Sequence, residues 1–419
     1  MQVMGTAVLV ARPMAAGVVR CLVALLGLAA SRVSLEVLSA DDFISLTMCM
    51  MAVAVGGTLL FPLNRRFWAE YSADTFNAVL ASGAVLFALI VPPICTLLLL
   101  LTHGTAGWDL TTPVLAAVCA VAYHASRCSY GSLTMQMAMA KGLMFSAALA
   151  GLELLSVLWM QATHNDQLSF RLLLPSLGFL AVLPLLNRWV GQTHARVLPV
   201  WKIGEVTRNA VADIVTALGL ITIVASIFLT LGATVDRVAL PAVCRGSGFV
   251  ECDHLAELVL ISVYCTAFLS ILTLLVDWAR PRVLVGGLWQ PLADRRVIGA
   301  VAMIAVLTVA AIVVGWTAGR WLHLIPEPIE WSFWALMVAR FGMLACINVV
   351  QIDLWMSKRI VLVLPAWIIA TAVVPIALFA GAGSWSLAAL LVVSDGVILL
   401  LLAWETRAFL HRHRNGNAA

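Results

Sequence analysis

The stretch LSADDFISLTMCMMAVAVGGTLLFPLNRRFWAEYSAD, Leu38 to Asp74, decides the fold of this chain. An acidic pair lies near its start, the 21 residues from Phe43 to Leu63 carry no charge, and Arg65 and Arg66 follow. At about 1.5 Å per residue, a helix of that length spans about 30 Å, the thickness of the hydrocarbon core of a bilayer. The stretch predicts a transmembrane helix whose basic end faces the cytoplasm, because translocation disfavours Arg and Lys in short loops.

The composition extends this prediction to the whole chain. Of 419 residues, 63% are hydrophobic and only 11% are charged. A water-soluble protein of this composition would expose large apolar patches. We therefore expect a multi-pass protein of a bacterial inner (plasma) membrane, surrounded by membrane lipids. The net charge of +4 comes from loop arginines, so it does not indicate a nucleic-acid partner.

A second unit of the same design lies about 210 residues further on. Asp253 precedes the apolar run 254–276, and Trp278 and Arg280 follow that run. The repetition predicts an all-α membrane protein with two pseudo-symmetric halves of six helices each. The expected parts are a six-helix bundle at 1–190, a cytoplasmic linker at 191–205, a six-helix bundle at 206–406 and a basic cytoplasmic tail at 407–419. The expected spans are 14–36, 43–68, 76–101, 113–130, 142–161, 172–189, 206–231, 254–277, 297–321, 331–355, 360–379 and 385–404.

The distribution of basic residues predicts the orientation. With both termini in the cytoplasm, the inner loops and tails hold 18 of the 25 Lys and Arg residues. The outer loops hold five, namely Arg32, Arg171, Arg237, Arg245 and Arg320. This excess is what the positive-inside rule requires. The outer loops are also too short for a catalytic domain.

Cysteine spacing indicates neither a metal site nor a cofactor. None of the nine cysteines forms a CxxC motif or a cluster with histidine. Cys244 and Cys252 share one predicted outer loop, where they could form a disulfide.

Charged side chains inside spanning helices cost a few kcal/mol or more each, so they usually face a bundle interior or an aqueous cavity. Arg20 and Asp213 lie at similar depths in the first helices of the two halves. We expect Arg20 to line a substrate cavity and to pair with Asp213 when the cavity is empty. A static ion pair between helices is the alternative.

Two further polar groups are candidates for the cavity. Arg340, Asn348 and Gln351 share one face of the span 331–355, which suits a wet lumen, although hydrogen bonds between helices are the alternative. His124 and Arg127 are neighbours at i, i+3 and could bind phosphate or carry a proton. Arg127 could also simply extend to the cytoplasmic interface.

Glu153 and Asp395 lie near the middle of the membrane without an obvious local partner. Each could bind H⁺ or Na⁺ as a coupling carboxylate, or be neutral and hydrogen-bonded. Asp236 and Arg237 are expected to cap the outer end of the span 206–231 rather than to touch substrate.

Two segments resemble a known family. SRVSLEVLSADDFISLTMCM (31–50) is similar to a pattern of basic residue, short loop, acidic pair and second helix in the MOP superfamily of flippases. LGATVDRVALPAV (231–243) is similar to the Asp-Arg pair at the start of that family's second half. The likeness is greatest to Wzx-type exporters of O-antigen or exopolysaccharide repeat units. The insertion between Arg237 and Asp253 departs from the pattern.

The resemblance implies a transporter that flips a polyprenyl-diphosphate-linked oligosaccharide by alternating access through a cationic central cavity. It implies no cofactor and no enzymatic step, while other membrane proteins of polysaccharide assembly become possible partners. Efflux of small molecules, as in MATE-like transporters, is the first alternative. A polyprenyl-dependent glycosyltransferase using Asp41 and Asp42 in the first outer loop is the second.

Overall fold

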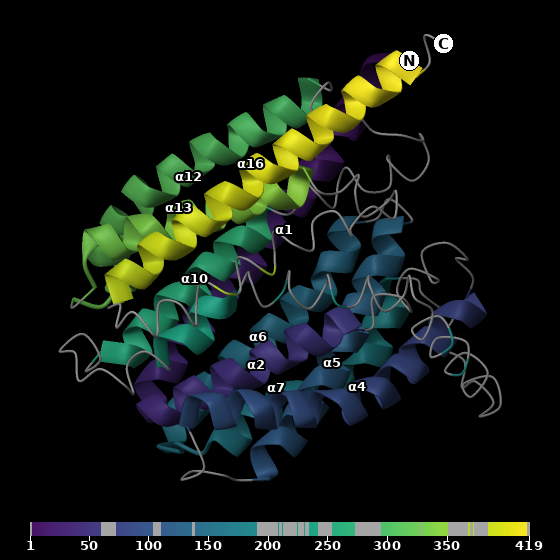
Figure 1. The fold of residues 1–419 in the computed structure, drawn as a ribbon. Helices are drawn as coiled ribbons and strands as arrows, with labels where there is room; N and C mark the ends of the chain where they lie inside the picture. The colour runs from purple at the N-terminus through teal and green to yellow at the C-terminus, as the bar shows by residue number, and fades with distance from the viewer. Residues whose placement is uncertain are drawn as a thin grey trace. The chain divides into compact units, whose positions relative to one another are not determined.

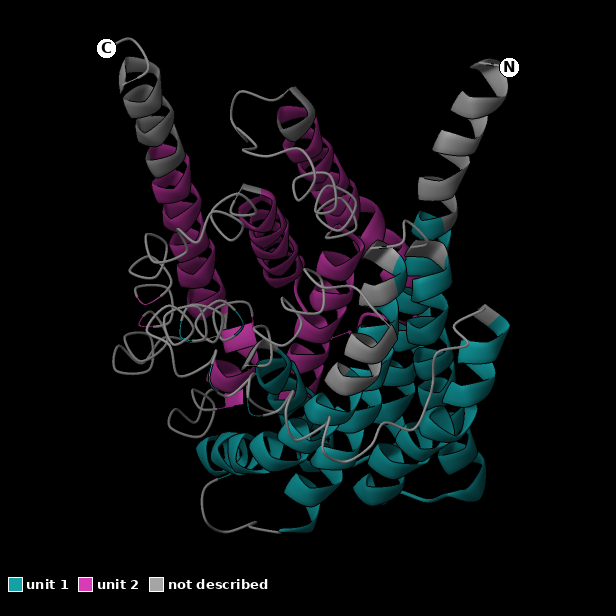
Figure 2. Ribbon diagram, turned by 90° about the vertical axis from the view of Figure 1, so that its right-hand side faces the viewer, with its two compact units in different colours: residues 1–230 teal, residues 231–419 magenta. Residues whose placement is uncertain are grey.

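The computed structural model describes most of the chain. The described residues are 2–59, 73–103, 110–135, 139–190, 234–241, 254–272, 295–327, 329–350 and 384–416, together with the single residues 208, 212, 224, 230, 368 and 372. The chain forms two compact units, residues 1–230 (unit 1) and 231–419 (unit 2), coloured separately in Figure 2. Each unit is described by itself below.

All regular secondary structure in the described residues is helical, and nine of these helices are long and apolar enough to cross a membrane. The expected fold class, an all-α polytopic membrane protein, is confirmed. The expected spans 206–231 and 360–379 and the expected linker 191–205 fall almost entirely outside the described residues.

Unit 1 contains six described helices in a bundle (Figure 1). All of them except α5 are apolar enough to count among the nine candidate membrane spans. Its helices are α1 (Gln2–Val37), α2 (Ala40–Leu59), α4 (Ala73–His103), α5 (Thr111–Met135), α6 (Met139–Thr163) and α7 (Leu168–Val190). Helix α5 packs against α2, α4, α6 and α7, whereas α1 packs along α6. Phe145 and Phe179 are completely buried between these helices, with Leu133 and Leu149 beside them. The central position explains how α5 carries the buried polar side chains His124, Ser126 and Ser129.

Local chemistry explains where α2 begins. The Ser39 hydroxyl accepts a hydrogen bond from the Asp42 amide at 3.1 Å and donates one to the Asp42 carboxylate at 2.8 Å. Asp41 and Asp42 occupy the first turn, where the helix dipole favours negative charge. The acidic pair is therefore explained as a helix start.

Unit 2 is organised around α13 (Trp331–Val350), which packs against three other helices. These are α10 (Leu255–Leu272), α12 (Arg295–Trp321) and α16 (Ser384–Gly416). Residues 234–241 are also helical. Helix α12 exposes Val306, Val309 and Val314 by more than 60% each, as expected for side chains in contact with lipid. Helix α16 continues through most of the predicted basic tail.

Candidate functional site

The main candidate site is a buried charge cluster in unit 2, centred on Arg340. The Arg340 side chain is completely buried, and its two carboxylate partners are 1% and 2% exposed. Its Nη1 donates to Oδ1 of Asp236 at 2.5 Å, and its Nε donates to Oδ2 of Asp395 at 3.2 Å. One guanidinium thus connects α13 to α16 and to the helical segment 234–241.

Hydroxyl groups of α10 complete the cluster. Ser262 donates to Oδ2 of Asp236 and accepts a bond from Nε of Arg237 at 3.3 Å. Nη2 of Arg237 donates to Oγ1 of Thr266 at 2.5 Å. Four helical elements therefore supply hydrogen-bonding groups to one place.

The cluster lies near the middle of its helices. Arg340 is nine residues after Trp331 and Asp395 is ten after Trp385, so each lies about 14 Å along its span. Burying one such charge unpaired would cost several kcal/mol. Here two arginines face two aspartates, and the formal charges of these four side chains sum to zero. We call Asp236, Arg237, Arg340 and Asp395 the neutral cluster.

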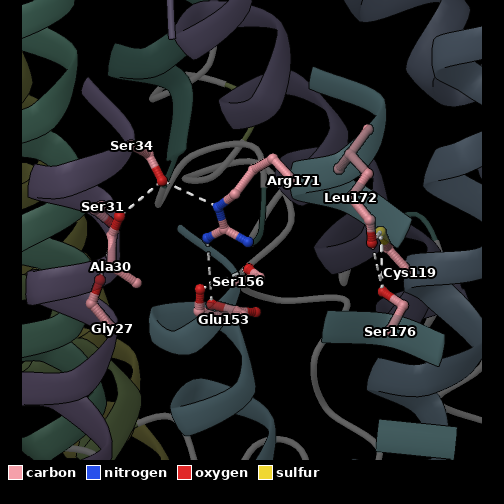
Figure 3. A network of polar contacts seen from close by, with 10 residues as sticks. All are labelled: Gly27, Ala30, Ser31, Ser34, Cys119, Glu153, Ser156, Arg171, Leu172 and Ser176. Atoms are coloured by element: carbon pink, nitrogen blue, oxygen red, sulfur yellow. Dashed lines mark hydrogen bonds and ion pairs between the residues drawn. The ribbon is translucent and has the colours of Figure 1, made fainter. Parts of the chain in front are cut away.

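A second, weaker network lies in unit 1 (Figure 3). Nε of Arg171, on α7, donates to Oγ of Ser34 on α1 at 3.0 Å. Nη2 of Arg171 lies 3.6 Å from Oε2 of Glu153 on α6. The Glu153 side chain is 20% exposed, so this pair is less completely removed from solvent than the pairs of Arg340. It joins three helices within unit 1.

These two networks add to one expectation from the sequence and correct two others. Within the described residues, Glu153 and Asp395 have no local partner on their own helices, as expected, but each lies beside an arginine of another helix. Asp236 and Arg237 are buried in the cluster rather than capping a helix end at the surface. Arg171, counted among the outer loops, is 7% exposed on α7. Sequence spacing within one helix could not reveal these pairs, because their partners are 18 to 104 residues away.

Two arginines of unit 1 lie over tyrosine rings of α5. Cζ of Arg20 lies 5.8 Å from the centroid of Tyr130, and Cζ of Arg127 lies 6.0 Å from that of Tyr123. Arg20 is half-buried and Arg127 is exposed. Asp213, the expected partner of Arg20, lies outside the described residues. The pairing of Arg20 with Asp213 stays a prediction.

His124 is nearly completely buried in the centre of unit 1. Its ring packs against Phe87 with centroids 5.0 Å apart, and its Nε2 lies 3.4 Å from Sγ of Cys128. A Cβ atom at Gly83 would collide with this ring, so the glycine on α4 creates the space that the histidine fills. This arrangement separates His124 from the exposed Arg127, three residues further along α5.

The remaining candidates are only partly described. Asn348 is half-buried on α13, two turns after Arg340. Gln351, Cys244 and Cys252 lie outside the described residues, so the end of the polar face and the disulfide stay predictions. Among the residues that are described, no group of His, Cys, Asp and Glu is arranged to hold a metal ion.

Comparison with known proteins identifies the fold. No family model matches the sequence, and no curated protein matches it. The inward-facing structure of a multidrug resistance MATE family transporter of the MOP superfamily matches with a TM-score of 0.56 and 12% identity, over 95% of this chain and 99% of that one. A MOP superfamily transporter from Pyrococcus furiosus Vc1 (DSM3638), reported with a binding pocket of reverse polarity, matches with a TM-score of 0.52 and 11% identity, over 97% and 93%.

A third structure, of a MATE protein in complex with Br-NRF, matches with a TM-score of 0.52 and 13% identity, over 96% of this chain and 94% of that one. The likeness covers nearly the whole of each chain. This chain therefore has the fold of the MOP superfamily transporters. At such low identities, the fold is all that the likeness establishes.

Proposed function

We propose that this protein is a transporter that flips a polyprenyl-diphosphate-linked oligosaccharide across a bacterial inner membrane. The fold supports transport, and the sequence likeness to Wzx-type exporters supports the substrate class. The observation that carries the proposal is the pair Arg20 and Arg127, which lie over the tyrosines of α5 and retain exposed surface.

Charge and geometry explain how such a pair would act. A diphosphate headgroup is anionic, and arginine binds phosphate oxygens through charge-assisted, often bidentate, hydrogen bonds. The tyrosine rings hold the guanidinium groups in place through cation–π contacts, at 5.8 Å for Arg20 and 6.0 Å for Arg127. The lipid tail would remain in the bilayer while the sugars cross. No covalent bond forms or breaks in this cycle.

Efflux of small molecules is the second candidate function. It is favoured by the match to a multidrug resistance MATE family transporter. The carboxylates of unit 2 would be the natural ligands for a cationic drug, but Asp236 and Asp395 already face Arg340. A glycosyltransferase is less favoured, because Asp41 and Asp42 form the first turn of α2.

The test is to measure lipid-linked repeat units on each face of the membrane in a strain that lacks the gene. Complementation would use the wild type, the double variant Arg20→Ala/Arg127→Ala and Arg32→Ala. Arg32→Ala is a control for the loss of one positive charge from α1, because Arg32 lies 12 residues after Arg20 on that helix and pairs with Glu36 at 3.1 Å. All variants are compared at equal expression.

Intact repeat units should accumulate on the cytoplasmic face, and the wild type and Arg32→Ala should clear them. The double variant should clear them at least about tenfold more slowly, because one charge-assisted hydrogen bond contributes about 1.5 kcal/mol or more. Repeat units shortened by one sugar would instead identify a transferase. If the strain that lacks the gene shows no change in repeat units on either face but no longer exports drugs, the protein is an efflux transporter.

A further inference from the structure

The neutral cluster of unit 2 contains oxygen atoms that could bind a cation. The guanidinium of Arg340 already occupies the position that such a cation would take. Asp236 and Asp395 approach Arg340 from two different helical elements, and Ser262 adds a hydroxyl from α10. Carboxylate and hydroxyl oxygens are the ligands that hard cations prefer. The guanidinium occupies the position between the two carboxylates.

Because the cluster is buried, the negative charges of its two carboxylates must be neutralised. Arg340 has no exposed surface, and both aspartates are at most 2% exposed. Two carboxylates at this depth must be neutralised by a bound cation, by protons or by a basic side chain. Arg340 provides that charge permanently, because arginine does not lose its proton in proteins.

We propose that Arg340 is a built-in counter-cation, so that unit 2 needs no external metal cation between Asp236 and Asp395. This inference rests on the proposed transport function and concerns what drives it. A transporter whose carboxylates are neutralised from within cannot use Na⁺ binding at this place to drive its cycle. Removal of the guanidinium should turn the same carboxylates into a Na⁺ site.

Arg237 does not replace Arg340 in this role. Its Nε and Nη2 atoms donate to the hydroxyls of Ser262 and Thr266, and it supplies only one positive charge to the cluster. Without Arg340, the cluster would therefore keep one positive charge for two negative ones. A single monovalent cation would restore neutrality.

Thermal unfolding of the full-length protein in lipid nanodiscs tests the proposal without measuring transport. Tm is recorded in NaCl and in choline chloride at equal ionic strength, for the wild type, Arg340→Ala and Arg340→Gln. Arg320→Ala is the matched control in unit 2, because the hydrogen bonds that Arg320 donates within the described residues go to the backbone carbonyls of residues 326, 327 and 329.

The wild type and Arg320→Ala should show the same Tm in both salts. At least one Arg340 variant should have a lower Tm in choline, with a saturable rise of about 4 °C or more in Na⁺. Adding Asp395→Asn to that variant should abolish the rise, because it removes one of the two negative charges.

Three outcomes would overturn the proposal. One is saturable stabilisation of the wild type by Na⁺ that Asp395→Asn removes. Another is that both Arg340 variants fold but show the same Tm in Na⁺ and in choline, which would mean that protons neutralise the carboxylates. The third is failure to recover either variant folded in Na⁺ buffer. None of these bears on whether lipid-linked oligosaccharide accumulates, so the transport proposal is judged separately.

Discussion

Arg340 and Arg171 show how differently one residue type can be placed in the two units. Arg340 is completely buried between two aspartates, at N–O distances of 2.5 and 3.2 Å. Arg171 faces one partly exposed glutamate at 3.6 Å. Water weakens the interaction of Arg171 with Glu153, whereas the buried interactions of Arg340 are not screened in this way.

Double-mutant cycles should therefore give different coupling free energies for the two pairs. We expect about 3 kcal/mol for Arg340→Met with Asp395→Asn, since a buried charge left unpaired is strongly destabilising. For Arg171→Met with Glu153→Gln, we expect about 1 kcal/mol or less. Equilibrium unfolding in mixed micelles measures both. Equal couplings would contradict the difference in burial that the structure shows.

At the scale of elements, the contact between α4 and α5 depends on a missing side chain. Gly83 leaves room for the His124 ring, which is held against Phe87. Gly57 on α2 similarly faces Arg127, but a Cβ there would come too close only to Nη1, the end of a flexible and exposed side chain, and would lie at ordinary contact distance from Phe87. The packed ring of His124 cannot move away from an added methyl group at Gly83, whereas the side chain of Arg127 can move away from one at Gly57.

Gly83→Ala should therefore lower the free energy of unfolding by about 1–3 kcal/mol, as overpacking of a core does. Gly57→Ala should cost clearly less, because Arg127 can move away. The same unfolding experiment measures both variants. In the double variant Gly83→Ala/His124→Ala the added methyl group has space, so the two effects should not be additive. Strict additivity would mean that the ring is not the obstacle.

Helices were the part of this chain most accessible to prediction from sequence. The uncharged runs give α2, α4 and α12 directly, because length and composition alone decide whether a segment can span a bilayer. The partners of Glu153 and Asp395 were not predictable, since they depend on which helix faces which. Arg171 was misplaced because a basic residue near a helix end looks like a loop residue in a charge count.

At the scale of the whole molecule, topology is the prediction that the sequence supports most strongly. Helix α6 offers a direct test, because Lys141 and the loop residue Asp166 lie at its opposite ends and are both exposed. The positive-inside rule places Lys141 in the cytoplasm and Asp166 outside.

In a variant without native cysteines, Asp166→Cys should react with a membrane-impermeant maleimide added to intact cells. Lys141→Cys should react only after the cells are permeabilised, and it serves as the matched control on the same helix. Reporter fusions at both termini should be active in the cytoplasm. The opposite labelling pattern would invert the topology and remove Arg20 from the face where the substrate is made.

The neutral cluster also determines how this protein would respond to membrane voltage. Moving one elementary charge through 100 mV involves about 2.3 kcal/mol, but a group of zero net charge that moves as a whole exchanges no such work with the field. Asp236, Arg237, Arg340 and Asp395 form such a group. Any electrical current that accompanies movement of this group would then be carried by the cargo, by an accompanying ion or by other charged side chains.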